Sequence, residues 1–170
     1  MSRSEVRDIP FASAKVVQRS DSGKWVLINS VPCDPDGDVN LQMQDARELA
    51  RKLSNTDPLD LCVLQCQGVI RAIKLGNRKP SSFEFIFRIP QELSDEPKSL
   101  RDYLSSQISH TLTDRFRIAN QLVKSISYMH TLGFVHKTIR PDTILEFQDK
   151  NSVLDSIFLV GSQNFRMADG

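Results

Sequence analysis

The longest regular pattern of apolar positions in this chain runs from residue 112 to residue 132. Apolar residues recur there at steps of three and four: Leu112, Phe116, Ala119, Leu122, Val123, Ile126 and Met129. This spacing predicts a helix with one apolar face. Thr111, followed three residues later by Asp114, is typical of a capping box at a helix start. Gly133 is typical of a helix end because glycine adopts the left-handed conformation without strain.

Runs of apolar and β-branched residues predict strands on both sides of this helix. Residues 24–31 alternate apolar and β-branched residues, with Trp25 and Leu27 on one face and Val26 and Ile28 on the other, which predicts a strand. In 82–89, apolar residues alternate with Glu84 and Arg88, which is the period of a strand with one buried face. A strand over 61–73 is expected to pair with 82–89 across a turn that contains glycine and asparagine. After the long helix, residues 144–147 and 157–160 predict a second hairpin.

Two shorter helices are predicted before the long one. The first covers 40–53, with Asn40 as its candidate N-cap. The second covers 99–108, and Ser99 with Asp102 predicts a capping box at its start. This second helix is expected to turn three side chains inward: Leu100, Tyr103 and Leu104.

Composition and charge are those of an ordinary globular protein. Of the 170 residues, 39% are hydrophobic and 25% charged, and the formal net charge is +1. This balance gives no electrostatic footprint for nucleic acid or an anionic membrane surface. No apolar run is long enough to cross a bilayer, and the first thirty residues lack the apolar run of a secretory signal. We therefore expect a cytoplasmic chain that contacts neither nucleic acid nor, by itself, a membrane.

The three cysteines and three histidines do not indicate a metal site. Cys33, Cys62 and Cys66 are an odd number without framework spacing, so buried reduced thiols are expected. A structural zinc ion needs four converging ligands, and the histidines are not clustered with these thiols in the sequence. No metal is expected.

The segment after the long helix carries the most informative motif. Residues 136–145 read His-Lys-Thr-Ile-Arg-Pro-Asp-Thr-Ile-Leu. This segment resembles the catalytic-loop region of eukaryotic protein kinases, H-R-D-L-K-P-x-N-I-L. Four residues match the kinase pattern: His136, Pro141, Ile144 and Leu145. Three more are similar: Lys137, Ile139 and Arg140.

The two residues that perform the chemistry in kinases are replaced in this motif. Thr138 stands where a kinase has the aspartate that accepts the substrate proton. Thr143 stands where a kinase has the asparagine that binds a magnesium ion. The resemblance therefore implies a degenerate catalytic loop with no catalytic residue, made of His136, Lys137, Thr138, Arg140, Pro141 and Thr143.

Other kinase elements are also missing. Gly23 is the only glycine in the region of the phosphate-binding loop, and the strand at 24–31 lacks the lysine of V-A-I-K. Gly161 and Ser162 follow Val160 where D-F-G would stand. Glu48 is a possible counterpart of the helix glutamate, but without a partner lysine it is expected to be a surface carboxylate.

The resemblance implies an α+β, protein kinase-like fold. Residues 1–22 are expected to form a flexible tail or linker, 24–90 an N-lobe of antiparallel sheet plus one helix, and 91–170 the first part of a helical C-lobe. A hinge that could contact adenine through its backbone is expected between the lobes, at Arg88, Ile89, Pro90 and Gln91.

A narrower resemblance rests on three further segments. Trp25–Ile28, Arg115–Ala119 and Phe158–Gly161, taken with the catalytic-loop motif, resemble the degenerate kinase-like domains of filamentous fungi. Those domains often lie beside a membrane-targeting HeLo-type domain in incompatibility and cell-death proteins. This likeness implies a role in such signalling by analogy only.

Three functions follow from these resemblances. The first is a catalytically inactive pseudokinase module that binds a protein partner through the apolar face of helix 112–132. The chain ends where a kinase C-lobe would continue, so Phe116, Leu122 and Ile126 are expected to face partly into water. The second function is binding of ATP and magnesium, with residual phosphotransferase activity. The third possibility is a truncated product without function.

Overall fold

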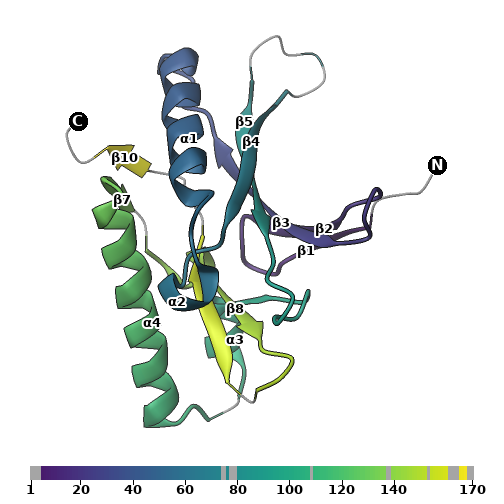
Figure 1. The fold of residues 1–170 in the computed structure, drawn as a ribbon, viewed down its shortest axis with the longest axis vertical. Coiled ribbons are helices and arrows are strands. Elements are labelled where there is room, and N and C mark those ends of the chain that lie inside the picture. The colour runs from purple at the N-terminus through teal and green to yellow at the C-terminus, as the bar shows by residue number, and fades with distance from the viewer. Residues whose placement is uncertain are drawn as a thin grey trace.

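The structure is a computed structural model that describes residues 5–73, 76, 80–107, 109–136, 139–152 and 154–160, together with the backbone of 165–167. Its described part is a mixed α and β fold (Figure 1). Five strands form an antiparallel sheet, in the order β1 (Val6–Asp8), β2 (Ala14–Gln18), β3 (Trp25–Pro32), β5 (Ser82–Arg88) and β4 (Cys66–Ala72). The expected α+β class and antiparallel sheet are confirmed.

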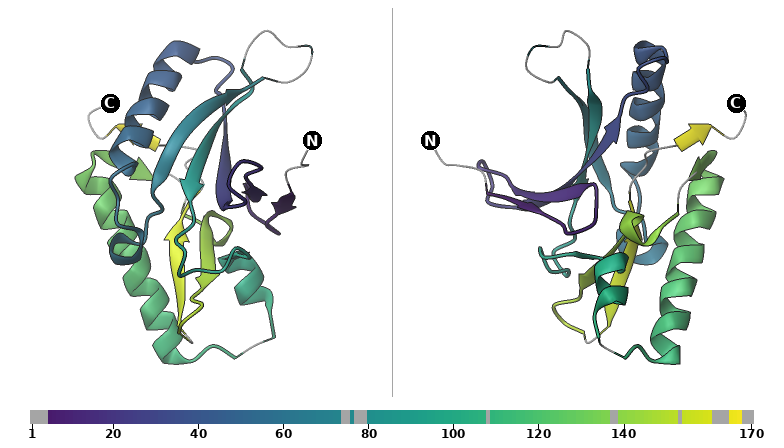
Figure 2. Two further views of the ribbon diagram at one scale, coloured as in Figure 1. Left: turned by 45° about the vertical axis from the view of Figure 1, so that its right-hand side comes forward. Right: turned by 180° about the vertical axis from the view of Figure 1, so that it is seen from behind.

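Two smaller sheets and the helices complete the described fold. A three-stranded sheet has the order β6 (Lys98–Ser99), β8 (Ile144–Gln148) and β9 (Asp155–Leu159), and β7 (Phe134–His136) pairs with β10 (Phe165–Met167). The helices are α1 (Val39–Leu53), α2 (Pro58–Leu61), α3 (Leu100–Ser105) and α4 (Leu112–Thr131), with a 3₁₀ turn η1 (Pro141–Thr143). Figure 2 shows α4 at one side of the molecule and the β1–β2 hairpin at the other.

Helix α1 packs on the five-stranded sheet through one apolar face. It buries five residues, against β4 and β5: Met43, Ala46, Leu49, Ala50 and Leu53. The Asp38 carboxylate accepts hydrogen bonds from the amides of Asn40 and Leu41, at 2.8 and 3.4 Å. Asp38, rather than Asn40, is therefore the N-cap, because its side chain satisfies the first free amides of the helix. Glu48 lies on the surface as expected, 3.4 Å from Lys52.

Helix α4 begins and nearly ends where the sequence predicts. The Thr111 hydroxyl accepts from the Asp114 amide at 3.1 Å, and the Asp114 carboxylate accepts from the Thr111 amide at 3.2 Å. This reciprocal pair is the predicted capping box. Gly133 follows the helix with φ +81°. Lys52 on α1 donates to the Leu132 carbonyl at 2.7 Å, which joins α1 to the end of α4.

The prediction of a flexible tail over 1–22 is wrong for the described residues of that segment. They form β1 and β2, and Ile9, Ala14 and Val16 are buried. Each strand has at most five residues, so the local alternation is too short to predict it. Pairing with β3 stabilises β2, because every residue of β2 is aligned with a residue of β3.

Two other elements differ from their predicted bounds. The strand predicted from residue 61 begins at Cys66, because Asp57 caps the short helix α2 and Cys62 turns the chain with φ +56°. Helix α3 ends at Ser105, and Leu104 is 54% exposed instead of inward. Leu100 is buried as expected. Short helices are set by caps and tertiary contacts more than by periodicity.

One continuous hydrophobic core connects the five-stranded sheet with β8 and β9. Leu27 from β3 and Leu145 from β8 belong to the same buried cluster, and both are 0% exposed. Phe147 and Phe158 meet edge to face in this cluster, with ring centroids 5.4 Å apart. A second, smaller cluster lies beneath α4 and contains Leu100, Ile144, Ile157 and Leu159. The two parts of the fold therefore share one interior.

All three cysteines of the chain lie among the described residues. Cys33, Cys62 and Cys66 are all free, and the last two are buried, as expected. Burial raises the pKa of the Cys66 thiol to about 11, which keeps it protonated.

Among the described residues, no helix combines the length and the apolar character needed to cross a membrane.

Candidate functional site

The described part of the predicted catalytic loop is held together around Val160. His136, at the end of β7, is buried, and its Nε2 lies 3.2 Å from the Val160 carbonyl oxygen. The Val160 amide donates to the Thr143 carbonyl at 2.8 Å. Burial lowers the pKa of His136, which favours a neutral ring. Lys137 and Thr138 lie outside the described residues.

Thr143 and Arg140 close the turn that begins at Pro141. The Thr143 hydroxyl donates to the Arg140 carbonyl at 2.9 Å and accepts from the Arg140 amide at 3.0 Å. The Arg140 guanidinium pairs with Asp142 at 2.9 Å and is 55% exposed. These hydrogen bonds and the ion pair hold residues 140–143 in the turn η1. The predicted Gly161-Ser162 segment lies outside the described residues.

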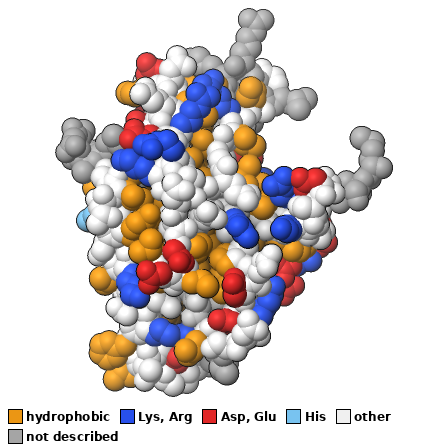
Figure 3. Space-filling model, viewed as in Figure 1, with side chains coloured by type: hydrophobic (Ala, Val, Ile, Leu, Met, Phe, Trp, Pro, Cys, Tyr) orange, Lys and Arg blue, Asp and Glu red, His pale blue; other side chains and the backbone are white. Residues whose placement is uncertain are grey.

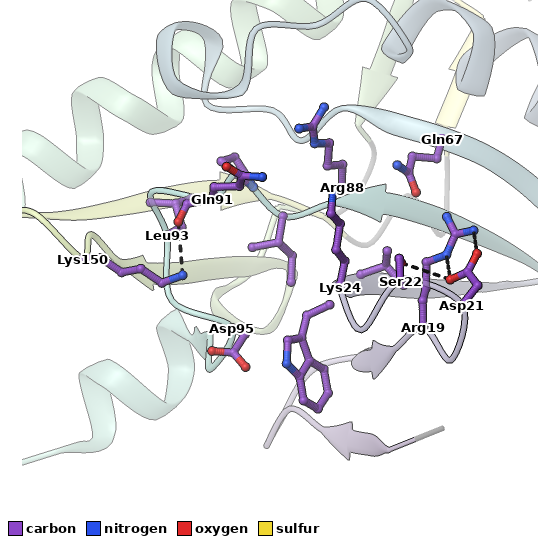
Figure 4. A pocket seen from close by; sticks show the side chains of 14 residues that line it. Arg19, Asp21, Ser22, Lys24, Gln67, Arg88, Gln91, Leu93, Asp95 and Lys150 are labelled. Carbon is purple, nitrogen blue, oxygen red and sulfur yellow. Dashed lines mark hydrogen bonds and ion pairs between the residues drawn. The ribbon is translucent and has the colours of Figure 1, made fainter. Parts of the chain in front are cut away.

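The predicted hinge lines a cavity of about 480 Å³. Arg88, Ile89, Pro90 and Gln91 form one wall, and the turn between β2 and β3 forms another (Figure 4). The Arg19 guanidinium pairs with Asp21 in that turn. The sequence predicted the hinge residues, but it gave no signal that the β2–β3 turn and Lys150 would reach the same cavity.

Much of the hinge backbone is already hydrogen-bonded within the chain. The Arg88 amide donates to the Gln65 carbonyl at 2.9 Å, and the Pro90 carbonyl accepts from the Leu93 amide at 3.1 Å. The Gln91 carbonyl accepts from Lys150 at 3.1 Å, as Figure 4 shows. Proline also lacks an amide hydrogen. These bonds use three of the backbone groups that the predicted hinge could offer to a purine.

The space between the five-stranded sheet and β8 is filled by side chains. Val16 and Leu27 on the sheet are 1% and 0% exposed, and Leu145 and Phe147 on β8 are both 0% exposed. A side chain with no accessible surface has no room for a water molecule beside it. A nucleotide lying against these four residues would therefore require the core to open.

The outer face of α4 carries a row of exposed apolar side chains. Leu112, Phe116 and Val123 are 69%, 68% and 59% exposed, and Ala119 between them is exposed as well. Their steps of four, three and four residues place them on one line along the helix. Figure 3 shows hydrophobic side chains at the lower left, over the beginning of α4.

The predicted stripe is exposed to different degrees along its width. Phe116 is largely exposed, while Leu122 and Ile126 are partly exposed, as expected, and pack on the small cluster beneath α4. The predicted stripe therefore divides into an inner and an outer row. Periodicity alone does not separate the two, since they lie on neighbouring faces of one helix.

The charged residues that α4 itself places beside the outer row are positive. Arg115 and Lys124 are exposed on its two sides. Asp114 is the only acidic residue of α4, and it is bound in the capping box and near Arg117, at 3.7 Å. The Asp114 pKa is lowered chiefly by its hydrogen bonds with Thr111. Helix α4 therefore contributes an apolar row with a cation on each side, and Asp60 on the contacting helix α2 adds an exposed acidic residue nearby.

Sequence reasoning did not single out Glu146 or Asp155. Glu146 is buried in β8, and Asp155 is the first residue of β9. The available signal is a charged residue inside the otherwise apolar run Ile144–Phe147. Such a residue is unusual in a buried strand and indicates a polar contact or a site.

Models of known protein families do not match this chain, and no curated protein matches it.

Proposed function

We propose that this chain is a non-catalytic, pseudokinase-like binding module that recognises a protein partner through the outer face of α4. The observation that carries the proposal is the row of exposed apolar residues on that helix. The five-stranded antiparallel sheet with α1 packed on it supports the kinase-like part of the proposal. A role in fungal incompatibility or cell-death signalling is implied by the sequence resemblance alone.

The partner that fits this face is an amphipathic helix with an apolar stripe and acidic borders. The row from Leu112 to Val123 extends about 16 Å along α4, enough for three turns of a partner helix. Acidic side chains on that helix would meet Arg115 and Lys124. A second copy fits less well, because antiparallel pairing of two α4 helices would place the Arg115 side chains of both copies on the same side of the interface.

A synthetic helix with a leucine stripe and glutamate borders is expected to bind the purified chain. Phe116→Ser is expected to weaken this binding at least tenfold, about 1.4 kcal/mol, because it removes the central aromatic side chain. Leu104→Ser is the matched control, since Leu104 is also exposed but lies on α3. Fluorescence anisotropy of the labelled peptide measures the affinity.

Two results would contradict this partner assignment. The first is equal binding by a matched peptide whose borders are lysine instead of glutamate. The second is a concentration-dependent dimer of the chain, seen by sedimentation, that Phe116→Ser dissociates. Equal loss of peptide binding in Phe116→Ser and Leu104→Ser would indicate non-specific adsorption and count against the site.

We also expect no change in melting temperature when ATP and magnesium are added. A ligand that binds only the folded state at about 100 times its Kd stabilises it by about 2.7 kcal/mol. The hinge carbonyls of Pro90 and Gln91 already accept internal hydrogen bonds, and the core beneath the sheet is closed. A thermal-shift titration tests this expectation. A saturable rise with ATP, absent with magnesium alone, would favour the nucleotide-binding alternative.

A further inference from the structure

A second cavity, of about 380 Å³, lies beside the three-stranded sheet and α3. Four of its lining residues are acidic: Glu96, Asp102, Glu146 and Asp155. Lys98 is the basic lining residue, and the Tyr103 side chain forms part of the wall. The lining thus carries more negative than positive charge. This acidic pocket is separate from the hinge cavity and from the outer row of α4.

Strand register places Glu146 inside this pocket. Glu146 lies between Ile144 and Gln148 on one face of β8, and Ile144 of that face belongs to the small cluster beneath α4. Its neighbour across β9 is Ile157, and Asp155 is two residues away on the same face. The two carboxyl groups are therefore diagonal cross-strand neighbours, close enough to interact.

One oxygen of the buried Glu146 carboxyl group has no hydrogen-bond partner among the described residues, although the side chain also interacts with the acidic Asp155. Glu146 is only 6% exposed, and the oxygen without a partner is Oε1. A buried charge without a partner is strongly unfavourable. In a folded protein, such a group indicates a missing ligand or a functional role.

Neither of the nearby basic side chains, Lys98 and Arg117, forms an ion pair with Glu146 among the described residues. Lys98 is directly opposite Glu146 in β6, but it is exposed, and no ion pair joins the two in the described structure. Arg117 on α4 donates to the Asp155 backbone carbonyl at 2.8 Å, and its other terminal nitrogen lies 3.7 Å from Asp114. The charges of both cations nevertheless act on the Glu146 carboxyl group and oppose the rise of its pKa.

We infer that the acidic pocket binds an organic cation, an alkyl guanidinium or ammonium group that pairs with Glu146 and Asp155. A guanidinium fits this arrangement because its planar fork offers several donors to two carboxyl groups. The Tyr103 ring in the wall is stacked on His110 on one face, with centroids 4.0 Å apart, and its other face can interact with a cation. The same group can come from a free small molecule or from an arginine side chain of a peptide.

Binding of a cation here is expected to depend on pH. Burial, and next the charge of Asp155, raise the pKa of Glu146 to about 7, while Arg117 and Lys98 oppose this shift. Asp102 and Tyr103 on α3 and Glu96 before β6 are the other ionisable groups in the pocket. A cation prefers the ionised carboxylate, so its affinity should rise about tenfold from pH 6 to pH 8, as Glu146 loses its proton.

Titration calorimetry of the purified chain tests the inference with two probes. Agmatine represents a free guanidinium, and an acetylated, amidated Ala-Arg-Ala peptide represents an arginine side chain. Either probe should bind more tightly at pH 8 than at pH 6, and Glu146→Gln should weaken binding at least tenfold. Glu48→Gln, which removes the same charge from the distant helix α1, should leave the affinity unchanged.

The outcomes separate the two sources of the cation and decide the inference. Binding of agmatine alone assigns the pocket to a free small molecule, whereas tighter binding of the peptide assigns it to a peptide side chain. Failure of both probes to bind at millimolar concentration would overturn the inference. Equal affinities in the Glu146→Gln and Glu48→Gln variants would overturn it as well.

Discussion

Phe147→Ala is expected to lower the free energy of unfolding by about 4 kcal/mol, the typical cost of removing a fully buried phenylalanine. Phe147 is 0% exposed and packs edge to face on Phe158 in the core that joins the two parts of the fold. The variant loses both the transferred apolar area and an aromatic pair. For a chain of this size, the loss corresponds to a fall in melting temperature of about 8 to 16 °C.

Phe116→Ala is the matched control for this experiment. It removes the same side chain from a position that is 68% exposed, so its effect on unfolding should be within about 0.5 kcal/mol. Urea denaturation of both variants measures the two free energies. Equal effects of the two substitutions would contradict the continuous core. A two-step transition for the unmodified chain would contradict it too, since separate cores would unfold independently.

Glu146→Gln is expected to stabilise the chain at pH 8 by about 3 kcal/mol and to have little effect at pH 5. The folded state raises the pKa of Glu146 from 4.5 to about 7. Between these two values the folded chain holds a proton that the unfolded chain has released. Stability therefore falls as pH rises through this window, and the full penalty is present above pH 7. Glutamine has nearly the same shape and no charge, so the variant avoids the penalty.

Urea denaturation at several pH values measures this difference between the variant and the unmodified chain. Subtracting the two curves removes the contribution of groups that titrate identically in both proteins. Glu48→Gln is the control, because its carboxylate is a partly exposed member of an ion pair with Lys52 and should give a small, nearly constant difference. A Glu146→Gln difference that stays constant from pH 5 to pH 8 would show that Glu146 is ionised normally.

Local signals account for the parts of the fold that the sequence predicted well. The Thr111–Asp114 capping box and the positive φ of Gly133 depend on a few neighbouring residues, so the bounds of α4 were readable. The alternation in β5 is equally local, because three phenylalanines share one face of a single strand: Phe83, Phe85 and Phe87. The bounds of these elements are therefore set by residues within them or directly beside them.

Features that depend on tertiary contacts were missed. Strands β1 and β2 are too short to show a pattern, and they form because β3 offers a pairing edge. The division of the α4 stripe into inner and outer rows depends on where the small cluster lies. The unpartnered Oε1 atom of Glu146 depends on tertiary contacts, since Arg117 donates to the Asp155 carbonyl instead, and no spacing in the sequence records this.

The candidate site likewise has features that the sequence predicted and features that only the structure supplied. The motif at residues 136–145 predicted that His136 and Thr143 belong to one loop, and they do meet at the backbone of Val160. The Thr143 hydroxyl also bonds the backbone of Arg140 and so shapes the turn at Pro141. The sequence predicted an apolar face on this helix, and the structure adds which of its residues are exposed: Leu112, Phe116 and Val123.

Amide hydrogen exchange of the purified chain, with and without the helix that has glutamate borders, tests the central proposal most directly. The proposal predicts that added peptide increases protection across Leu112–Thr131 and leaves β8 and β9 unchanged, because the partner lies along the outer face of α4. The Phe116→Ser variant should show no increase. Protection that appears elsewhere in the chain, or no change in α4 at a saturating concentration of peptide, would contradict the proposal.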